Sequence, residues 1–163
     1  MVLGPVEYGP LAYIVDNMRR RDCEEIFATR YPLGPEGDTE ALIQTTLDAA
    51  TRSGVGWLAS RDGEPIAVIG MSMLWPGVAS VWMYSTDSFH KIALPLTKWA
   101  KKTIVCLMND ADIHRAHCWS AANHVAANRW LRFLGATEEC TVPNYGRNGE
   151  TFRLYGWSKG RDF

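Results

Sequence analysis

Three consecutive strand-like segments, separated by short turn signals, constrain the fold of this chain more than any other feature. VGWLAS leads through the turn sequence RDGE into PIAVIGMSML, and WPG separates that segment from VASVWMYST. An Asp-Gly pair between apolar segments is a strong hairpin signal. The sequence therefore predicts an antiparallel meander over residues 55–86.

The segments before the meander carry mainly helical patterns. VEYGPLAYIV holds a short strand and the start of a helix, and a second helical pattern covers Asp16 to Arg30. After the loop YPLGPEGD, the segment TEALIQTTLDAATRS predicts a helix that Asp38 or Thr39 caps and that stops at Gly54. These segments place helices ahead of the meander in the chain.

The segments after the meander alternate between helix and strand. A helix is expected to begin between Ile92 and Leu94, because Pro95 fits only a first turn. IHRAHCWS then predicts a strand, residues 123–134 a helix and TFRLYGWS a last strand. The order β-α-α-β-β-β-α-β-α-β predicts the α/β (α+β) class, with helices packed on a mixed sheet, in one domain of residues 1–163.

The helix expected in NHVAANRWLRFLGAT is amphipathic and ends at a glycine. Its apolar residues recur at i, i+3, i+4 and i+7, and they are Ala127, Trp130, Leu131 and Leu134. This spacing predicts one buried stripe that includes Trp130. Gly135 follows where a left-handed residue commonly ends a helix.

Composition excludes several classes of function. The formal net charge is −1 and the sequence pI is about 6.4, so no bulk attraction to nucleic acid is expected. No apolar run is long enough to span a membrane. The four cysteines are scattered without CxxC pairs, which is typical of free thiols in the cytoplasm. His114 and His117 would face opposite sides of a strand, so no metal site is expected.

Three motifs resemble those of one family. The helix at 123–135 resembles the last conserved helix of the GCN5-related N-acetyltransferases (GNAT). More narrowly, ANRWLRFLG resembles the RWL-x-x-LG form in acetyltransferases of short-tailed bacteriophages, a group that includes internal virion proteins. NMRRRDCEEIFA is similar to that group's N-[ML]-R-x-x-D-x-x-E-[IV]-x-A, and VWMYST to its WML-x-T. The three motifs occur in the family's order.

The resemblance implies a fold and a chemistry. The fold is a mixed, mostly antiparallel sheet with helices on both faces. The strands containing Trp82 and His117 are expected to run parallel and to splay apart near Met83 and Trp119. The chemistry is acyl transfer from acetyl-CoA to an amine of a protein or a small molecule.

The resemblance also implies site residues. The cofactor-binding residues carried over are the backbone groups of Met83 and Tyr84, the loop residues Thr86, His90 and Lys91, and the helix residues Asn123 and Trp130.

Two residues are candidates for the catalytic base of this transfer. His124 stands near a helix N-terminus, which favours a neutral imidazole base, and the alternative is a capping or core histidine. Glu25 is the second candidate, and the alternative is a solvated carboxylate in a surface ion network with Arg19 and Asp22.

The loop at residues 86–94 leaves two functions open. It contains no glycine, although the family's pyrophosphate loop is rich in glycine, and Asp87 adds a negative charge. The first hypothesis is an acyl-CoA-dependent N-acyltransferase of phage origin, located in the host cytoplasm or packaged in a virion. The second is a non-catalytic GNAT scaffold that contacts a virion or host protein.

Overall fold

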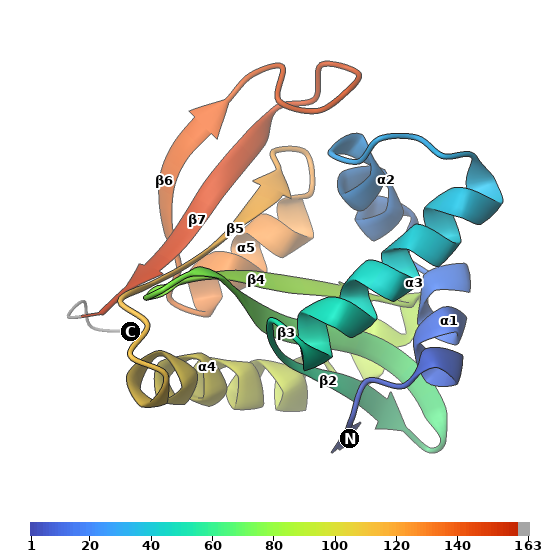
Figure 1. The fold of residues 1–163 in the computed structure, drawn as a ribbon, viewed down its shortest axis with the longest axis horizontal. Helices are drawn as coiled ribbons and strands as arrows, with labels where there is room; N and C mark the ends of the chain where they lie inside the picture. The colour runs from blue at the N-terminus through green and yellow to red at the C-terminus, as the bar shows by residue number, and fades with distance from the viewer. Residues whose placement is uncertain (160–163) are drawn as a thin grey trace.

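A seven-stranded sheet forms the centre of the computed structural model, which describes residues 1–159 (Figure 1). Residues 160–163 of the predicted domain lie outside the described part. The strands are β1 (Val2–Gly4), β2 (Gly54–Arg61), β3 (Glu64–Trp75), β4 (Val78–Ser85), β5 (Arg115–Ala121), β6 (Thr137–Val142) and β7 (Phe152–Ser158). The helices are α1 (Tyr8–Asp16), α2 (Arg20–Ala28), α3 (Pro35–Thr51), the 3-10 helix η1 (Asp87–Lys91), α4 (Ala93–Asp110) and α5 (Val125–Phe133).

The sheet is mostly antiparallel, in the order β1-β2-β3-β4-β5-β7-β6. Strands β2, β3 and β4 form the predicted meander, and β5, β7 and β6 pair antiparallel beyond it. Only β4 and β5 pair in parallel among the described strands. The predicted mixed sheet of the α/β class is confirmed.

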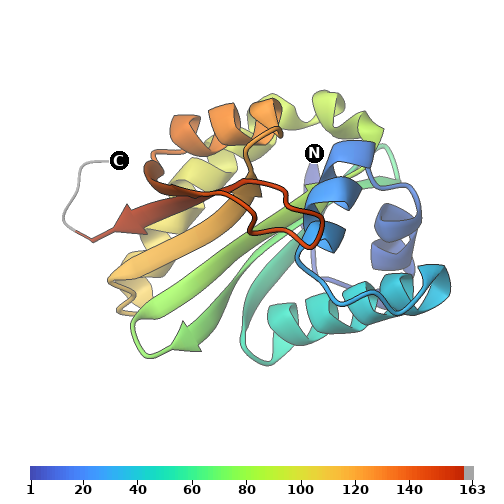
Figure 2. The ribbon, with the colours of Figure 1, turned by 90° about the horizontal axis from the view of Figure 1, so that it is seen from above.

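Helices cover both faces of the sheet (Figures 1 and 2). Helices α1 and α3 bury Leu11, Ile14 and Leu42 against one face, while α4 buries Leu96 and Ile104 against the other. Between the two layers, β3 is buried along most of its length. A strand covered on both faces reads as a continuous apolar run, as PIAVIGMSM does.

The parallel pair separates after three residues. Val78–Ser80 of β4 pairs with Arg115–His117 of β5, and beyond these residues the two strands are no longer paired. The predicted parallel pairing of the strands that contain Trp82 and His117 is therefore confirmed. The separation begins a little before the predicted positions, Met83 and Trp119.

The helical segment predicted from Asp16 to Arg30 is wrong in its boundaries. Helix α1 ends at Asp16 and α2 begins at Arg20, so three helices precede the meander instead of two. The break arises because Met18 forms a bridge with Thr86 and Arg19 N donates to Ser85 O at 2.9 Å. Pairing with the end of β4 takes these residues out of the helix.

Helix α3 begins at Pro35, three residues before Asp38 and four before Thr39, the two predicted caps. Gly34, with φ of 89°, precedes Pro35 in the first turn. Asp38 lies inside the helix, and its Oδ1 accepts a hydrogen bond from the Leu33 N–H at 2.8 Å. The carboxylate therefore satisfies a backbone group before the helix instead of starting it.

Strand β6 was missed by the sequence pattern. It is the last strand of the sheet, and most of its residues are exposed. An edge strand without a buried face does not alternate between polar and apolar residues, so TEECTV carries little strand signal.

Helix α5 ends at its glycine as predicted, but its buried stripe differs. Gly135 has φ of 92° and donates to Arg132 O, while Ala136 N donates to Leu131 O, which together form a Schellman motif. Leu131 and Leu134 are buried, whereas Ala127 and Trp130 are half-buried. The predicted burial of Trp130 is thus wrong in degree, because this side chain borders a cavity.

Two glycines make room for the Trp82 ring on the α3 face of the sheet. A Cβ atom built on Gly70 would overlap the ring, and one on Gly56 would lie 3.0 Å from it. We expect Gly70→Ala to lower the free energy of unfolding by about 1–3 kcal/mol, the usual cost of overpacking. Gly4→Ala is the matched control, since no atom lies within 4 Å of that position. Urea denaturation of both variants measures the difference, and equal stability would contradict the close approach.

Candidate active site

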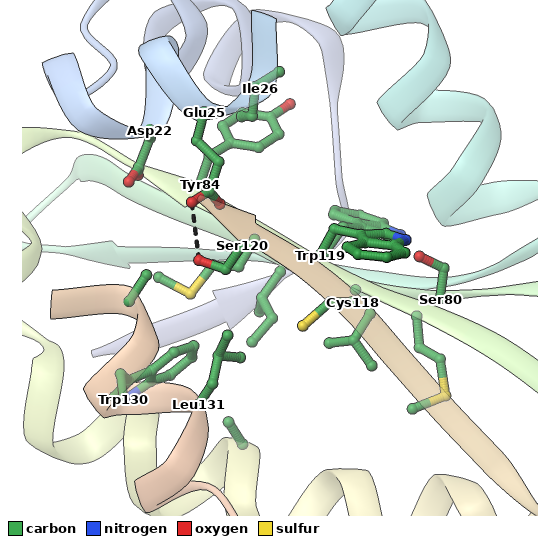
Figure 3. Close-up of a pocket in the computed structure, with 18 of the residues that line it drawn as sticks. Asp22, Glu25, Ile26, Ser80, Tyr84, Cys118, Trp119, Ser120, Trp130 and Leu131 are labelled. Carbon is green, nitrogen blue, oxygen red and sulfur yellow. Dashed lines mark hydrogen bonds between the residues drawn. The ribbon is translucent and has the colours of Figure 1, made fainter. Parts of the chain in front are cut away.

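A cavity of about 630 Å³ occupies the space where β4 and β5 separate. Because the sheet is open at this point, the cavity is lined from both faces. On the α5 side its apolar lining consists of Met83, Phe89, Trp99, Cys118, Trp130 and Leu131. On the α2 side its lining consists of Ile26, Thr29, Arg30, Trp82, Tyr84 and Trp119. Figure 3 shows the two sides, with Glu25 reaching towards Ser120 on β5 and Trp130 across the strand.

The backbone of Met83 is directed into the gap. Thr86 N donates to Ile66 O of the β3 segment, so even-numbered residues of β4 turn their peptide groups towards β3. Odd-numbered residues therefore face the gap, as Ser85 N does when it donates to Asp22. Two residues were carried over for contacts of their backbone. The peptide group of Met83 faces the gap, and that of Tyr84 faces β3.

The same alternation directs the Trp119 peptide group into the gap from β5. Ala122 N donates to Thr151 O, and Lys159 N donates to His114 O, so the even-numbered residues face β7. Met83 and Trp119 both lie beyond the last paired residues of their strands. The gap is therefore bordered by strand peptide groups, which bind polar ligand atoms well.

Asp22 joins three elements at one end of the gap. This buried carboxylate on α2 accepts hydrogen bonds from Arg19 Nη2 at 2.9 Å, from Ser85 N at 2.9 Å and from His124 Nε2 at 2.9 Å. Its partners connect α2 to the end of β4 and to the start of α5. Asp22 was predicted to belong to a surface ion network, and its burial corrects that prediction.

His124 uses both of its ring nitrogens within the protein. It is the N-cap of α5, and Nδ1 accepts a hydrogen bond from Ala127 N at 3.3 Å. A backbone N–H can only donate, so the ring proton sits on Nε2 and is donated to Asp22. The sequence alternatives were a base and a cap, and this geometry is that of a cap.

Glu25 reaches from α2 to the end of β5. Its Oε2 accepts from Ser120 Oγ at 2.9 Å and from Ala121 N at 2.7 Å. Burial is the main cause that raises the pKa of the Glu25 carboxyl above its ordinary value, and these two hydrogen bonds oppose the shift. A partly desolvated carboxylate with a raised pKa, at the wall of a cavity, has the properties of a general base.

The loop after β4 is held by Glu64 at the start of β3. Ser88 Oγ donates to Glu64 Oε1 at 2.6 Å, and Lys91 Nζ lies 2.7 Å from Oε2. His90 Nδ1 lies 3.0 Å from the carbonyl oxygen of Asp87, and Thr86 Oγ1 accepts from Ser88 N at 3.3 Å. Three of the residues carried over for cofactor binding therefore lie in one short loop at the mouth of the cavity.

Aromatic rings border the cavity between this loop and α5. The rings of Phe89 and Trp130 meet edge to face at 6.2 Å, and Trp130 Nε1 donates to Thr97 Oγ1 at 2.8 Å. The Arg19 guanidinium lies 4.8 Å from the centre of the Phe89 ring. Asn123, the remaining carried-over residue, is exposed in the turn before α5.

The residues that the sequence prediction missed are the partners of the predicted ones. Asp22, Arg30 and Glu64 were given no site role, although the first two share the cavity lining with Glu25. The spacing of Asp22, Glu25 and Ile26 at i, i+3 and i+4 was an available signal, because it places both carboxylates on the helix face that carries an apolar residue.

Within residues 1–159, no group of three or more His, Cys, Asp or Glu side chains is arranged to hold a metal ion. None of the helices in this range combines the length and the apolar character that crossing a membrane requires.

Removing the Asp22 carboxylate should destabilise the fold. We expect Asp22→Ala to lower the free energy of unfolding by about 3 kcal/mol, because it leaves buried partners without a counter-charge or an acceptor. Glu24→Ala is the control on the same helix, since Glu24 forms only exposed ion pairs with Arg20 and Arg21 and should change little. Chemical denaturation checks both, and equal effects of the two variants would contradict a stabilising role of the Asp22 hydrogen bonds.

Comparison with known proteins identifies the fold. No family model matches the chain, and no curated protein matches its sequence. Among solved structures, RimL, the ribosomal L7/L12 α-N-protein acetyltransferase in complex with coenzyme A, is similar with a TM-score of 0.73 and 13% identity, over 98% of this chain and 94% of that one.

Two further solved structures are similar over most of their length. The ribosomal-protein-S5-alanine acetyltransferase from Vibrio fischeri has a TM-score of 0.67 and 14% identity, over 97% of this chain and 92% of that one. A GNAT-family acetyltransferase from Bacillus anthracis has a TM-score of 0.70 and 11% identity, over 98% and 95%. At these identities the likeness concerns the fold, and residues 1–159 have the fold of the GNAT acetyltransferases.

Proposed function

We propose that this protein is an acyl-CoA-dependent N-acyltransferase that transfers an acetyl group to an amine, as a single catalytic domain. The observation that carries the proposal is the combination of a Met83 peptide group facing the gap and a Glu25 carboxylate of raised pKa on the wall of the same cavity. The similarity to acetyltransferases, one of them in complex with coenzyme A, supports the choice of acyl donor.

In this proposal each residue has a defined task. The Met83 N–H donates a hydrogen bond to the acetyl carbonyl oxygen, on which negative charge develops during attack. Glu25 accepts the proton of the attacking amine. The apolar α5 side, including Trp130 and Leu131, holds the pantetheine arm of acetyl-CoA and excludes water. His124 positions the Asp22 carboxylate at the cavity wall.

The role of Glu25 predicts a pH dependence. Because its pKa is raised above 4.5, we expect kcat/KM to increase with pH as Glu25 loses its proton in the folded protein. Glu25→Gln should remove this increase of kcat/KM with pH and lower kcat about 100-fold or more. If the variant kept both the pH dependence and the rate of the natural protein, the general base would be another residue.

The same substitution has a readout that does not depend on activity. A carboxyl with a raised folded-state pKa contributes its stability below its unfolded pKa and loses it as the pH rises through the folded pKa. Glu25→Gln should therefore gain stability relative to the natural protein between pH 4.5 and neutral pH. Urea denaturation at both ends of this range measures the gain, and a loss that grows with pH would contradict the raised pKa.

The loop after β4 predicts two substitutions of opposite sign. If the pyrophosphate of acetyl-CoA lies over residues 86–94, Asp87→Asn should tighten binding because it removes a like charge. Lys91→Ala should weaken binding about tenfold, the scale of one charge-assisted hydrogen bond. Calorimetric titration with acetyl-CoA measures both. If both variants changed the affinity for acetyl-CoA in the same direction, the pyrophosphate would not lie over this loop.

A second candidate function is a non-catalytic scaffold of phage origin that contacts a virion or host protein. The observation that favours it is that two polar side chains of this loop, Ser88 and Lys91, are already bound to Glu64 within the protein. The loop also contains no glycine that would allow close approach to phosphates. A thermal shift titration separates the two candidates. A melting temperature that is unchanged at millimolar acetyl-CoA supports the scaffold.

A further inference from the structure

Arg30 follows the C-terminal end of α2 and lines the α2 side of the cavity. It also lines a second, more open hollow between the α2–α3 connection and the loop that joins β6 to β7. Its Nη1 donates to Thr45 Oγ1 at 3.3 Å, and Thr45 is a neutral partner. Within residues 1–159, Arg30 forms no ion pair with a carboxylate at 4.0 Å or less.

The lack of a close ion pair distinguishes Arg30 from the other arginines of α2 and its N-cap. Arg19 is paired with Asp22, and both Arg20 and Arg21 are paired with Glu24. Burial is the main cause that lowers the pKa of the Arg30 guanidinium. The attraction of Asp38 opposes this shift in pKa, but Asp38 forms no ion pair with Arg30. Partial burial of a cation without an ion pair has a cost in free energy, which a bound anion would offset.

The α2 side also presents Glu25, so this carboxyl and the Arg30 guanidinium line the same cavity, together with the Arg19–Asp22 ion pair. Glu25 lies within α2 and Arg30 lies two residues after its end, and both line this cavity. The walls between them are apolar, and they include Trp82 and Trp119. Trp119 is held by stacking on Tyr145 at 4.4 Å. Such a chamber fits a ligand with a cationic end, an apolar body and an anionic end.

We propose that the acceptor is a small amine that carries a carboxylate, with its amine at Glu25 and its carboxylate bound by the Arg30 guanidinium. This inference rests on the proposed acyl transfer. The ammonium of the ligand first passes one proton to Glu25. The neutral amine nitrogen then forms a bond to the acetyl carbon as the C–S bond of the thioester breaks, and the second proton leaves with coenzyme A, which departs as the thiol. The ligand carboxylate is unchanged. A guanidinium holds a carboxylate through two parallel N–H···O bonds, which orients as well as binds it.

The test measures binding of matched ligand pairs by calorimetry. The probes are para-aminomethyl benzoate against its carboxamide, and γ-aminobutyrate against its carboxamide. We expect the carboxylate member of at least one pair to bind the natural protein about tenfold or more tightly than the carboxamide, as a charged bidentate pair implies. Equal binding within both pairs, or no binding of either carboxylate, would overturn the inference.

Three variants locate the preference. Arg30→Gln should abolish it, and Arg30→Lys should keep only part of it, because an ammonium retains the charge but not the planar fork. Arg52→Gln is the matched control, since Arg52 is an exposed residue at the end of α3 that lines neither hollow. A preference that survives Arg30→Gln would overturn the assignment.

Acetyl transfer to the same amines is measured separately. Transfer without a preference for the carboxylates would leave the proposed function standing and refute the Arg30 site. If the carboxylates bound more tightly than the carboxamides in a way that depends on Arg30, but no amine were acetylated, the proposed acyltransferase function would be refuted instead. In the positive case we expect Arg30→Gln to raise KM for the carboxylate amine while kcat changes less, since Arg30 binds the end of the acceptor that does not react.

Discussion

Two carboxylates of α2 take the place of a missing strand neighbour. Where β4 and β5 separate, their facing peptide groups lose each other as partners. Asp22 then accepts from Ser85 N, and Glu25 accepts from Ala121 N. Buried N–H groups without an acceptor have a large cost in free energy, so the opening depends on these two side chains. Met83 and Trp119 lie between the paired part of the strands and these contacts, where their peptide groups are left for a ligand.

This arrangement explains why the cavity is reached from two sides of one sheet. The α5 side is apolar, and the α2 side carries the charged groups Glu25 and Arg30. In the proposed acyl transfer the donor would be bound on the α5 side and the acceptor on the α2 side, so that the reacting atoms meet in the gap.

The parts of the fold that could be predicted are those with a strong local pattern. The meander, the helix start near Ala93 and the Gly135 turn follow from turn residues, periodicity and proline chemistry. Strand β6 and the break between α1 and α2 depend on contacts with distant residues, which no local pattern records. Met83 was a candidate from the resemblance, and Glu25 was a candidate base on α2. The sequence carried no information about Arg30 or Glu64, whose proposed roles rest on what they do or do not contact in space.

The β2–β3 hairpin gives the loop after β4 a remote support. Asp62 and Gly63 both have positive φ, 53° and 82°, which is typical of a tight type I′ turn. The residues on either side of this turn, Arg61 and Glu64, hold Lys91 through its carbonyl oxygen and its ammonium group. The shape of this loop is therefore set by the turn of a surface hairpin, residues 61–64, which do not line the cavity. Sequence drift or an insertion in this hairpin would alter ligand affinity from a distance, so natural variation in donor preference among chains of this fold need not lie in the lining residues.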